Sequence, residues 1–237
     1  MQFGRSMGTG GVTLLVAILL LLVAPVSAFA QMVLRGQVRV DLEPVYIHYV
    51  DVPYPLDTNT AHRHALEEVA LYFGAMIYGW TFDYDIGERA RKIPEVFELQ
   101  SLGSIPFGDP KLVVTDAKLE NSYLFVWVDY RPDETQQRRL AQWRSGTLIK
   151  TRGQGEGPLA GPIAVPRSES PLANTLQQSS WMDGKRAALE DAARAAVRAT
   201  LRGTERNRPK QSRGRIALAE FPRYWVDSGR WQCSAAF

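Results

Sequence analysis

Residues 60–86 have the sequence TAHRHALEEVALYFGAMIYGWTFDYDI, and this stretch is typical of a helix followed directly by a strand. Large apolar side chains recur at three- and four-residue steps and form one helical stripe: Leu66, Val69, Phe73, Met76, Ile77 and Trp80. Gly79 is the residue type that ends a helix in a left-handed conformation. From residue 80 to 86 apolar and polar residues alternate, which is the period of a half-buried strand. We therefore predict a helix over 62–79, with Thr58, Asn59 or Thr60 as its N-cap, and a strand over 80–86.

A second helix is predicted over 184–202, where alanine and other strong helix formers dominate and Gly203 follows as a stop. It contains ALEDAA at 188–193, which is similar to ALEEVA at 65–70 in the first helix. Two similar helices packed on one sheet would explain this likeness. A chance similarity between Ala-rich helices would explain it equally well.

Apolar patterns predict further strands over 33–47, 111–119, 123–130, 215–221 and 224–237, and a short helix before residue 97. The strand at 123–130, YLFVWVDY, is apolar on both faces, which predicts a central strand that is covered on both sides. Together these elements predict an α+β fold, in which two principal helices pack against a mostly antiparallel sheet.

Residues 1–30 have the pattern of a secretory signal peptide. Arg5 precedes an apolar run over 12–23, and Ala28-Phe29-Ala30 matches a small-x-small cleavage site. The run is shorter than the roughly 20 residues of a membrane span, although a retained anchor stays an alternative. We expect cleavage before Gln31 and a periplasmic or secreted mature protein.

The mature chain, 31–237, is expected to form a single domain with a flexible Gly/Pro/Ser-rich loop at about 153–180. GQGEG at 153–157 lacks the following GK[ST] of a nucleotide-binding loop, and no cofactor is expected. Cys233 is the only cysteine, so no disulfide can form within the chain. It is either a packed thiol or a partner for another chain.

Two groups of polar residues invite a catalytic or metal-binding interpretation. His62, His64, Glu67 and Glu68 have poor spacing for a metal, because helical residues two apart point in different directions. We expect them to be solvated, and no metal is expected. Asp83, Asp85 and Glu88 share the polar side of the predicted strand and could divide acid and base roles in a cell-envelope hydrolase. The same pattern is also typical of the solvent-exposed face of any amphipathic strand.

Residues 202–215, RGTERNRPKQSRGR, are predicted to form an exposed basic connector. A candidate binding site for an anionic envelope component, such as a lipid headgroup, an acidic glycan or an acidic protein, consists of Arg202, Arg206, Arg208, Lys210, Arg213 and Arg215. Nucleic acid is disfavoured because the chain is expected to be exported. A solubilising loop after a helix end that favours cations is the alternative.

Aromatic residues are numerous, and most fall on the apolar phase of predicted helices and strands, which favours core positions. Some are candidates for lining a glycan- or peptide-binding groove: Tyr72, Tyr78, Trp80, Tyr84, Tyr123, Trp127, Trp143, Trp181, Tyr224, Trp225 and Trp231.

Three strings carry a likeness that extends over most of the mature chain: MIYGWTFDYDIGERARKI at 76–93, IPFGDPKL at 105–112 and KRAALEDAARAAVRATLRGTERNRPK at 185–210. They resemble sequences in a group of uncharacterised exported proteins of spirochaetes. The resemblance implies an envelope protein and carries no activity or site residue. We therefore expect an exported cell-envelope protein that is non-catalytic, with a binding or structural role. The alternative is the hydrolase that would use Asp83, Asp85 or Glu88.

Overall fold

The computed structural model describes residues 32–44, 53–159, 180–204 and 211–237. Residues Val33–Phe237 form one compact unit, to which the following description applies. The signal peptide predicted for 1–30 lies outside the described residues. None of the helices in the described part of the chain is both long and apolar enough to cross a membrane.

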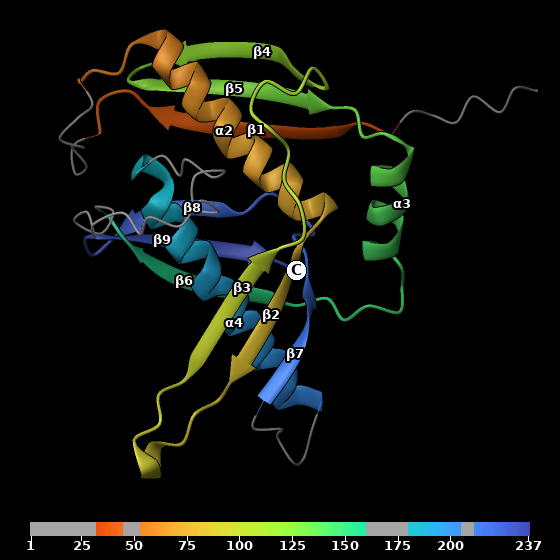
Figure 1. The fold of residues 1–237 in the computed structure, drawn as a ribbon. Coiled ribbons are helices and arrows are strands. Elements are labelled where there is room, and N and C mark those ends of the chain that lie inside the picture. Colours follow the sequence, from red (N-terminus) through yellow and green to blue (C-terminus); the bar gives the residue numbers. More distant parts are fainter. Residues whose placement is uncertain (1–31, 45–52, 160–179, 205–210) are drawn as a thin grey trace, which may run out of the picture. The chain divides into compact units, whose positions relative to one another are not determined.

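The chain alternates helices with short antiparallel strands (Figure 1). The elements are β1 (Leu34–Asp41), α2 (Thr58–Ile77), β2 (Trp80–Asp85), η1 (Arg89–Arg91), β3 (Val96–Ser101), β4 (Leu112–Glu120), β5 (Tyr123–Tyr130), α3 (Glu134–Trp143), β6 (Arg152–Pro158), η3 (Ser180–Met182), α4 (Asp183–Thr204), β7 (Gln211–Ile216), β8 (Arg223–Asp227) and β9 (Arg230–Ala236). The strands form three three-stranded sheets with the orders β1-β5-β4, β3-β2-β7 and β6-β9-β8. The α+β class is therefore confirmed, with three antiparallel sheets in place of one.

The compact unit contains two halves with similar connectivity. Each half has a strand, a long helix, a second strand and a hairpin, and its first strand pairs with the last strand of the hairpin: β1 with β5, and β6 with β9. The first half has one additional strand, β3, which precedes the hairpin and pairs with β2. The strands that follow the two helices, β2 and β7, pair with each other, so that Trp80 lies opposite Ile216 and Asp85 lies opposite Gln211. The similar sequences at 65–70 and 188–193 therefore occupy equivalent helices. These helices do not share one sheet, since α2 packs on β1 and β5 whereas α4 packs on β6 and β9 (Figure 1).

Helix α2 begins one turn earlier than the sequence suggests. Its N-cap is Asp57, whose carboxylate accepts a hydrogen bond from the backbone N–H of Thr60 at 3.0 Å. Thr58 and Asn59 are thus inside the first turn, and the predicted N-caps are wrong. The helix ends as expected, because Gly79 adopts a φ of 69° directly after the C-cap Tyr78.

Strand β6 replaces the first part of the loop predicted for 153–180. Gly153, Gly155 and Gly157 all face α4, whose backbone lies so close that no side chain would fit between. A Cβ atom on Gly155 would lie 2.1 Å from the backbone nitrogen of Ala192 and 2.4 Å from the carbonyl oxygen of Ala188. The glycines therefore let an Ala-rich helix pack directly on the strand. The loop prediction is wrong for 153–158, and residues 160–179 lie outside the described residues.

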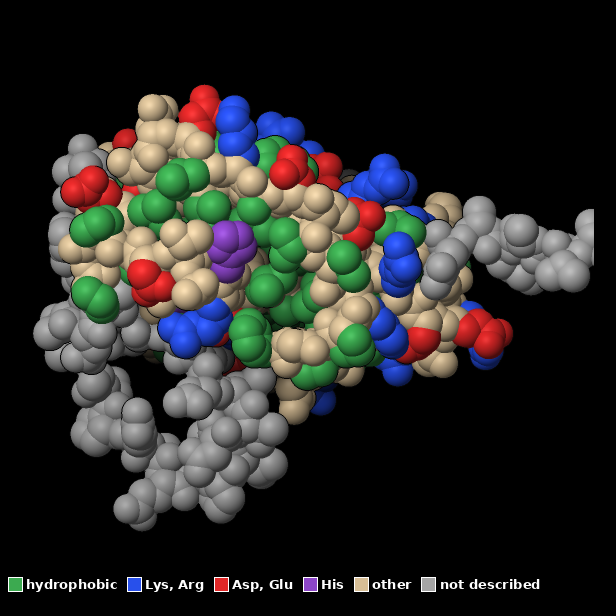
Figure 2. Space-filling model, turned by 90° about the horizontal axis from the view of Figure 1, so that it is seen from above, with side chains coloured by type: hydrophobic (Ala, Val, Ile, Leu, Met, Phe, Trp, Pro, Cys, Tyr) green, Lys and Arg blue, Asp and Glu red, His purple; other side chains and the backbone are tan. Residues whose placement is uncertain are grey.

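Strand β5 is central in its sheet, as predicted, but only one of its faces is buried. Leu124, Val126, Val128 and Tyr130 are buried beneath α2, whereas the opposite face is half-buried. Its neighbour β4 is an edge strand that is exposed along almost its whole length. Seen from above, the molecule has hydrophobic side chains intermixed with acidic and basic ones (Figure 2).

Three smaller expectations also change. The short helix predicted before residue 97 is a three-residue turn, Arg89–Arg91, followed by β3. Residues 224–237 form a hairpin in place of one strand, because Ser228 and Gly229 both have positive φ angles and make a tight turn. Residues 211–215 belong to strand β7, so the exposed connector predicted for 202–215 is wrong at its end.

Candidate ligand-binding cleft

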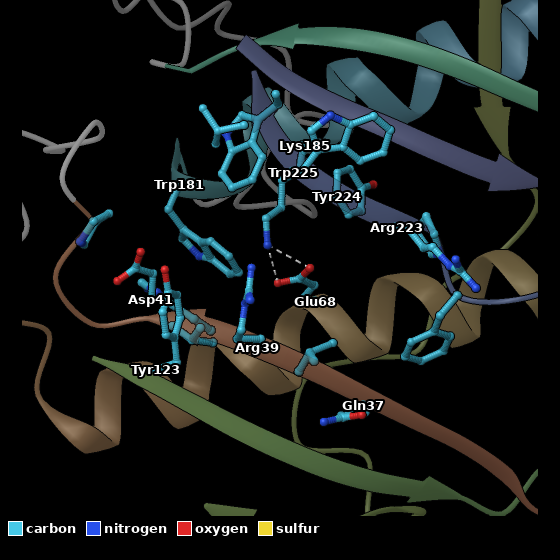
Figure 3. Close-up of a pocket in the computed structure, with 18 of the residues that line it drawn as sticks. Gln37, Arg39, Asp41, Glu68, Tyr123, Trp181, Lys185, Arg223, Tyr224 and Trp225 are labelled. Atoms are coloured by element: carbon cyan, nitrogen blue, oxygen red, sulfur yellow. Dashed lines mark hydrogen bonds and ion pairs between the residues drawn. The ribbon is translucent and has the colours of Figure 1, made fainter. Parts of the chain in front are cut away.

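A cleft of about 620 Å³ lies between the two halves and is called the aromatic cleft below. The first half contributes β1 and one side of α2, and the second half contributes the start of α4 and the segment around β8 (Figure 3). Its volume falls within the range of ligand sites, which is roughly 300–1,000 Å³. The residues used in the argument are Arg39, Asp41, His64, Glu68, Tyr72, Tyr123, Trp181, Lys185, Arg223, Tyr224, Trp225 and Trp231.

A buried ion pair connects the two halves inside the aromatic cleft. Lys185 at the start of α4 donates hydrogen bonds to both carboxylate oxygens of Glu68 on α2, at 2.9 and 2.8 Å (Figure 3). Glu68 also accepts a hydrogen bond of 2.6 Å from the hydroxyl of Tyr72, one helical turn further along. Glu68 and Lys185 are only 4% and 9% exposed. Each charge is therefore removed from water and depends on the other for compensation.

Aromatic rings surround the ammonium group of Lys185. The Lys185 nitrogen lies 5.7 Å from the ring centre of Trp181, 5.6 Å from that of Tyr224 and 5.2 Å from that of Trp231. These distances are within the range of cation–π attraction. Trp181 in turn stacks on His64, with 4.2 Å between the ring centres. The ion pair thus has a rigid aromatic wall around it.

Burial shifts the pKa values of the side chains that line this wall. Burial is the main reason that the pKa of His64 falls below its ordinary value of 6.5, so its imidazole is neutral at pH 7. The pKa of Tyr72 lies well above its ordinary value, first because of burial and second because of the adjacent Glu68 carboxylate. Both side chains therefore act as neutral hydrogen-bonding groups at physiological pH.

One buried donor in the cleft wall, the indole nitrogen of Trp231, has no hydrogen-bond partner among the described residues. The hydroxyl of Tyr224 interacts with the side chains of Tyr72 and Cys233. Buried polar groups are almost always hydrogen-bonded in folded proteins, so the unpaired indole nitrogen calls for an acceptor. Trp231 lines the aromatic cleft, where a ligand oxygen can supply that acceptor.

Charged side chains complete the cleft at its more exposed parts. The guanidinium group of Arg39 lies over the ring of Tyr123, 4.6 Å from the ring centre. Arg223 and Trp225 project from β8 and are exposed, and Asp41 is the remaining carboxylate (Figure 3). The exposed part of the cleft therefore offers two guanidinium groups and one carboxylate to a ligand.

The carboxylates suggested for hydrolysis lie elsewhere. Asp83 pairs with Arg213 across the β2–β7 ladder at 2.7 Å, and Asp85 accepts a hydrogen bond from Gln211. Glu88 pairs with Arg91 at 3.5 Å. The aromatic cleft is not lined by any of the three, and they are spread along an open sheet face and the turn that follows it.

The helix residues considered for a metal site have a different role. His64 and Glu68 are buried, so the expectation of solvated side chains is wrong for these two. Among the described residues no group of three or more His, Cys, Asp or Glu side chains is placed to hold a metal ion. Cys233 is a free, buried thiol on β9.

The described residues among those predicted as a basic binding site have different surroundings. Arg202 is exposed near the end of α4, and Arg213 is paired with Asp83. Arg215 lines a second cavity, described below. Arg206, Arg208 and Lys210 lie outside the described residues. Their role as a common anion site stays a prediction.

Only part of the cleft has a signal in the sequence. His64, Glu68 and Tyr72 follow four-residue steps, which places them on one side of α2 beside the apolar stripe. That polar row beside an aromatic residue is a signal for a second buried face. Lys185 and Arg223 have no comparable signal in the sequence, because they are distant from the first half along the chain and approach it only in the folded protein.

The fold and the cleft define an α+β protein built from two similar halves with a ligand-sized cleft between them. A protein-family model matches residues 23–164 and 167–237, and the chain belongs to that family. A protein of Treponema pallidum (strain Nichols), described as an uncharacterized protein, is 24% identical over 162 residues, which cover 68% of this chain and 60% of the relative. The chain thus spans less than two thirds of that relative. The expected similarity to an uncharacterised spirochaete protein is confirmed, whereas export stays a prediction. No solved structure matches this chain.

Proposed function

We propose that this protein is an exported, non-catalytic protein of the cell envelope that binds an acidic glycan in the aromatic cleft. The observation that carries the proposal is the buried Glu68–Lys185 pair, enclosed by aromatic rings and accompanied by the unpaired indole donor of Trp231, in a cleft of ligand size. The signal-peptide pattern of residues 1–30 supports export.

The chemistry of the cleft favours a glycan for three reasons. The face of Trp225, which is exposed in the cleft, offers an electron-rich surface on which the C–H face of a sugar ring can pack. The unpaired donor of Trp231 matches a hydroxyl or acetamido oxygen of a glycan. Arg223 is exposed in the same cleft and can hold a carboxylate of an acidic sugar through a charge-assisted hydrogen bond.

Isothermal titration with defined glycans tests this proposal. We expect a muramic-acid-containing tetrasaccharide to bind more tightly than neutral chitotetraose, and the difference to shrink as salt is raised, because exposed charges are screened. Equal affinity for both glycans at all salt concentrations, or no binding to either, would contradict it. Mass analysis of the recovered glycan addresses the hydrolase alternative: an intact glycan supports binding, and cleavage that is lost in Asp83→Asn, Asp85→Asn or Glu88→Gln supports the hydrolase.

Export is tested separately on protein recovered from its own cells. We expect the intact mass of the envelope or secreted fraction to correspond to a chain that begins at Gln31. A mass that retains residues 1–30 would contradict cleavage, and recovery with the cytosol would contradict export.

A further inference from the structure

A second cavity, of about 530 Å³, lies beside the C-terminal part of α4 and is lined by residues from several elements. Its interior is apolar and includes side chains from the ends of both long helices, from α3 and from the segment after β7. The buried residues of its wall are Met76, Leu140, Val197, Ile216, Ala217, Leu218 and Phe237. Leu148 and Ile149 extend this surface to the outside, where they are 42% and 63% exposed.

The charges of the second cavity have one sign. Arg144, Lys150 and Arg215 line it and are all exposed, so they lie where the cavity meets solvent. Among the described residues that line it there is no Asp or Glu side chain. Lys150 and Arg215 also form no salt bridge with any other described residue.

We propose that the second cavity binds a single-chain anionic amphiphile of the fatty-acid class, with the acyl chain in the apolar interior and the carboxylate beside Lys150 and Arg215. An apolar interior strongly disfavours the polar body of a nucleotide or a sugar, because those groups would lose their hydrogen bonds to water. A neutral apolar ligand would leave the cations at the mouth without a counterpart. An acyl chain with a carboxylate at one end satisfies both parts of the cavity.

Isothermal titration of the full chain with monomeric fatty acids tests the proposal. We expect laurate to bind and dodecyltrimethylammonium, which has the same chain length and the opposite charge, to bind at least tenfold more weakly. In the series octanoate, decanoate and laurate, each added pair of methylene groups strengthens binding by about tenfold, the effect of burying them in an apolar site. Equal binding of the two head groups, or no dependence on chain length, would overturn the proposal.

Matched variants locate the site. Leu148→Glu places a negative charge in the wall and is expected to weaken laurate binding at least tenfold, whereas Leu119→Glu, on the exposed edge strand β4, is expected to leave it unchanged. Lys150→Gln combined with Arg215→Gln is expected to remove the preference for the anionic head group. Arg35→Gln combined with Arg138→Gln removes the same number of charges at exposed positions outside the cavity and is expected to preserve it.

Two further outcomes also decide the question. If Leu119→Glu weakens binding as much as Leu148→Glu does, laurate binds nonspecifically and the proposal is wrong. If the protein binds vesicles that contain phosphatidylglycerol but not monomeric laurate, the cations act as a membrane-docking surface and the cavity assignment is overturned. This test is independent of the aromatic cleft, since the two cavities share no lining residue.

Discussion

Changing Glu68 to Gln, or Lys185 to Met, separates two charges that the fold has removed from water. Each single variant leaves one partner without its compensating charge, in a site where the pair is 4% and 9% exposed. Breaking a buried pair from one side costs about 3–5 kcal/mol of unfolding free energy. Lys185→Met is expected to fall in this range, because the Glu68 carboxylate would keep only the hydrogen bond from Tyr72.

The double variant should be far more stable than the sum of the singles predicts. With Glu68→Gln and Lys185→Met combined, no uncompensated charge remains, and the glutamine can still accept the hydrogen bond from Tyr72. Replacing both members of a buried pair is often neutral or stabilising, so we expect the double variant to lie within about 1 kcal/mol of the parent protein. The coupling energy between the sites should then reach about 3 kcal/mol.

Urea unfolding followed by tryptophan fluorescence and circular dichroism measures these differences. The control is Lys118→Met, which breaks the exposed Lys118–Glu120 pair of similar length, 2.8 Å, and should leave the free energy of unfolding unchanged within error. Single variants at Glu68 and Lys185 that behave like this control, with additive effects, would refute the reasoning. They would show that the pair is solvated and that the cleft is not a structured site.

Three further predictions concern the core and the two halves. Gly155→Ala should destabilise the fold by at least about 2 kcal/mol, because its Cβ would overlap the backbone of α4, whereas Gly146→Ala has open space around it and should not; equal midpoints in urea would contradict this. Phe73→Ala should lower the free energy of unfolding by about 3–5 kcal/mol, since Phe73 is fully buried against other rings. His62→Ala should lower it little, and the reverse order would show that the residues assigned to the buried face of the helix are wrong. Burial raises the pKa of the Cys233 thiol to about 12, so iodoacetamide should fail to label it at pH 8 in the folded protein and should label it fully in urea; rapid labelling of the folded protein would contradict its burial.

Local patterns were sufficient to predict the two long helices and many of the strands. The end of α2 at Gly79 and the strand that follows it, β2, both appear in the structure. These features depend on neighbours within a few residues, so the sequence contains nearly all the information that determines them.

The two failures with the largest consequences, strand β6 and the buried ion pair, have one physical cause, which is dependence on distant contacts. GQGEG has no side-chain pattern of a strand. Its glycines are explained by the close approach of the alanines of α4, about thirty residues further along the chain. The Glu68–Lys185 pair joins residues 117 positions apart, and no local pattern marks Lys185 as its partner. The tight turn at Ser228–Gly229 was different, because a Ser-Gly pair between apolar runs is a local hairpin signal that could have been used.

The most direct test of the aromatic cleft compares two tryptophan variants in binding to the acidic glycan. Trp225 is exposed in the cleft, whereas Trp127 is half-buried on the outer face of β5 and does not line it. By isothermal titration, Trp225→Ala should weaken binding by about tenfold, the value of one lost aromatic contact, while Trp127→Ala should leave the affinity unchanged. Equal affinities for the parent and both variants, or an equal loss in both variants, would contradict the assignment of the cleft as the binding site.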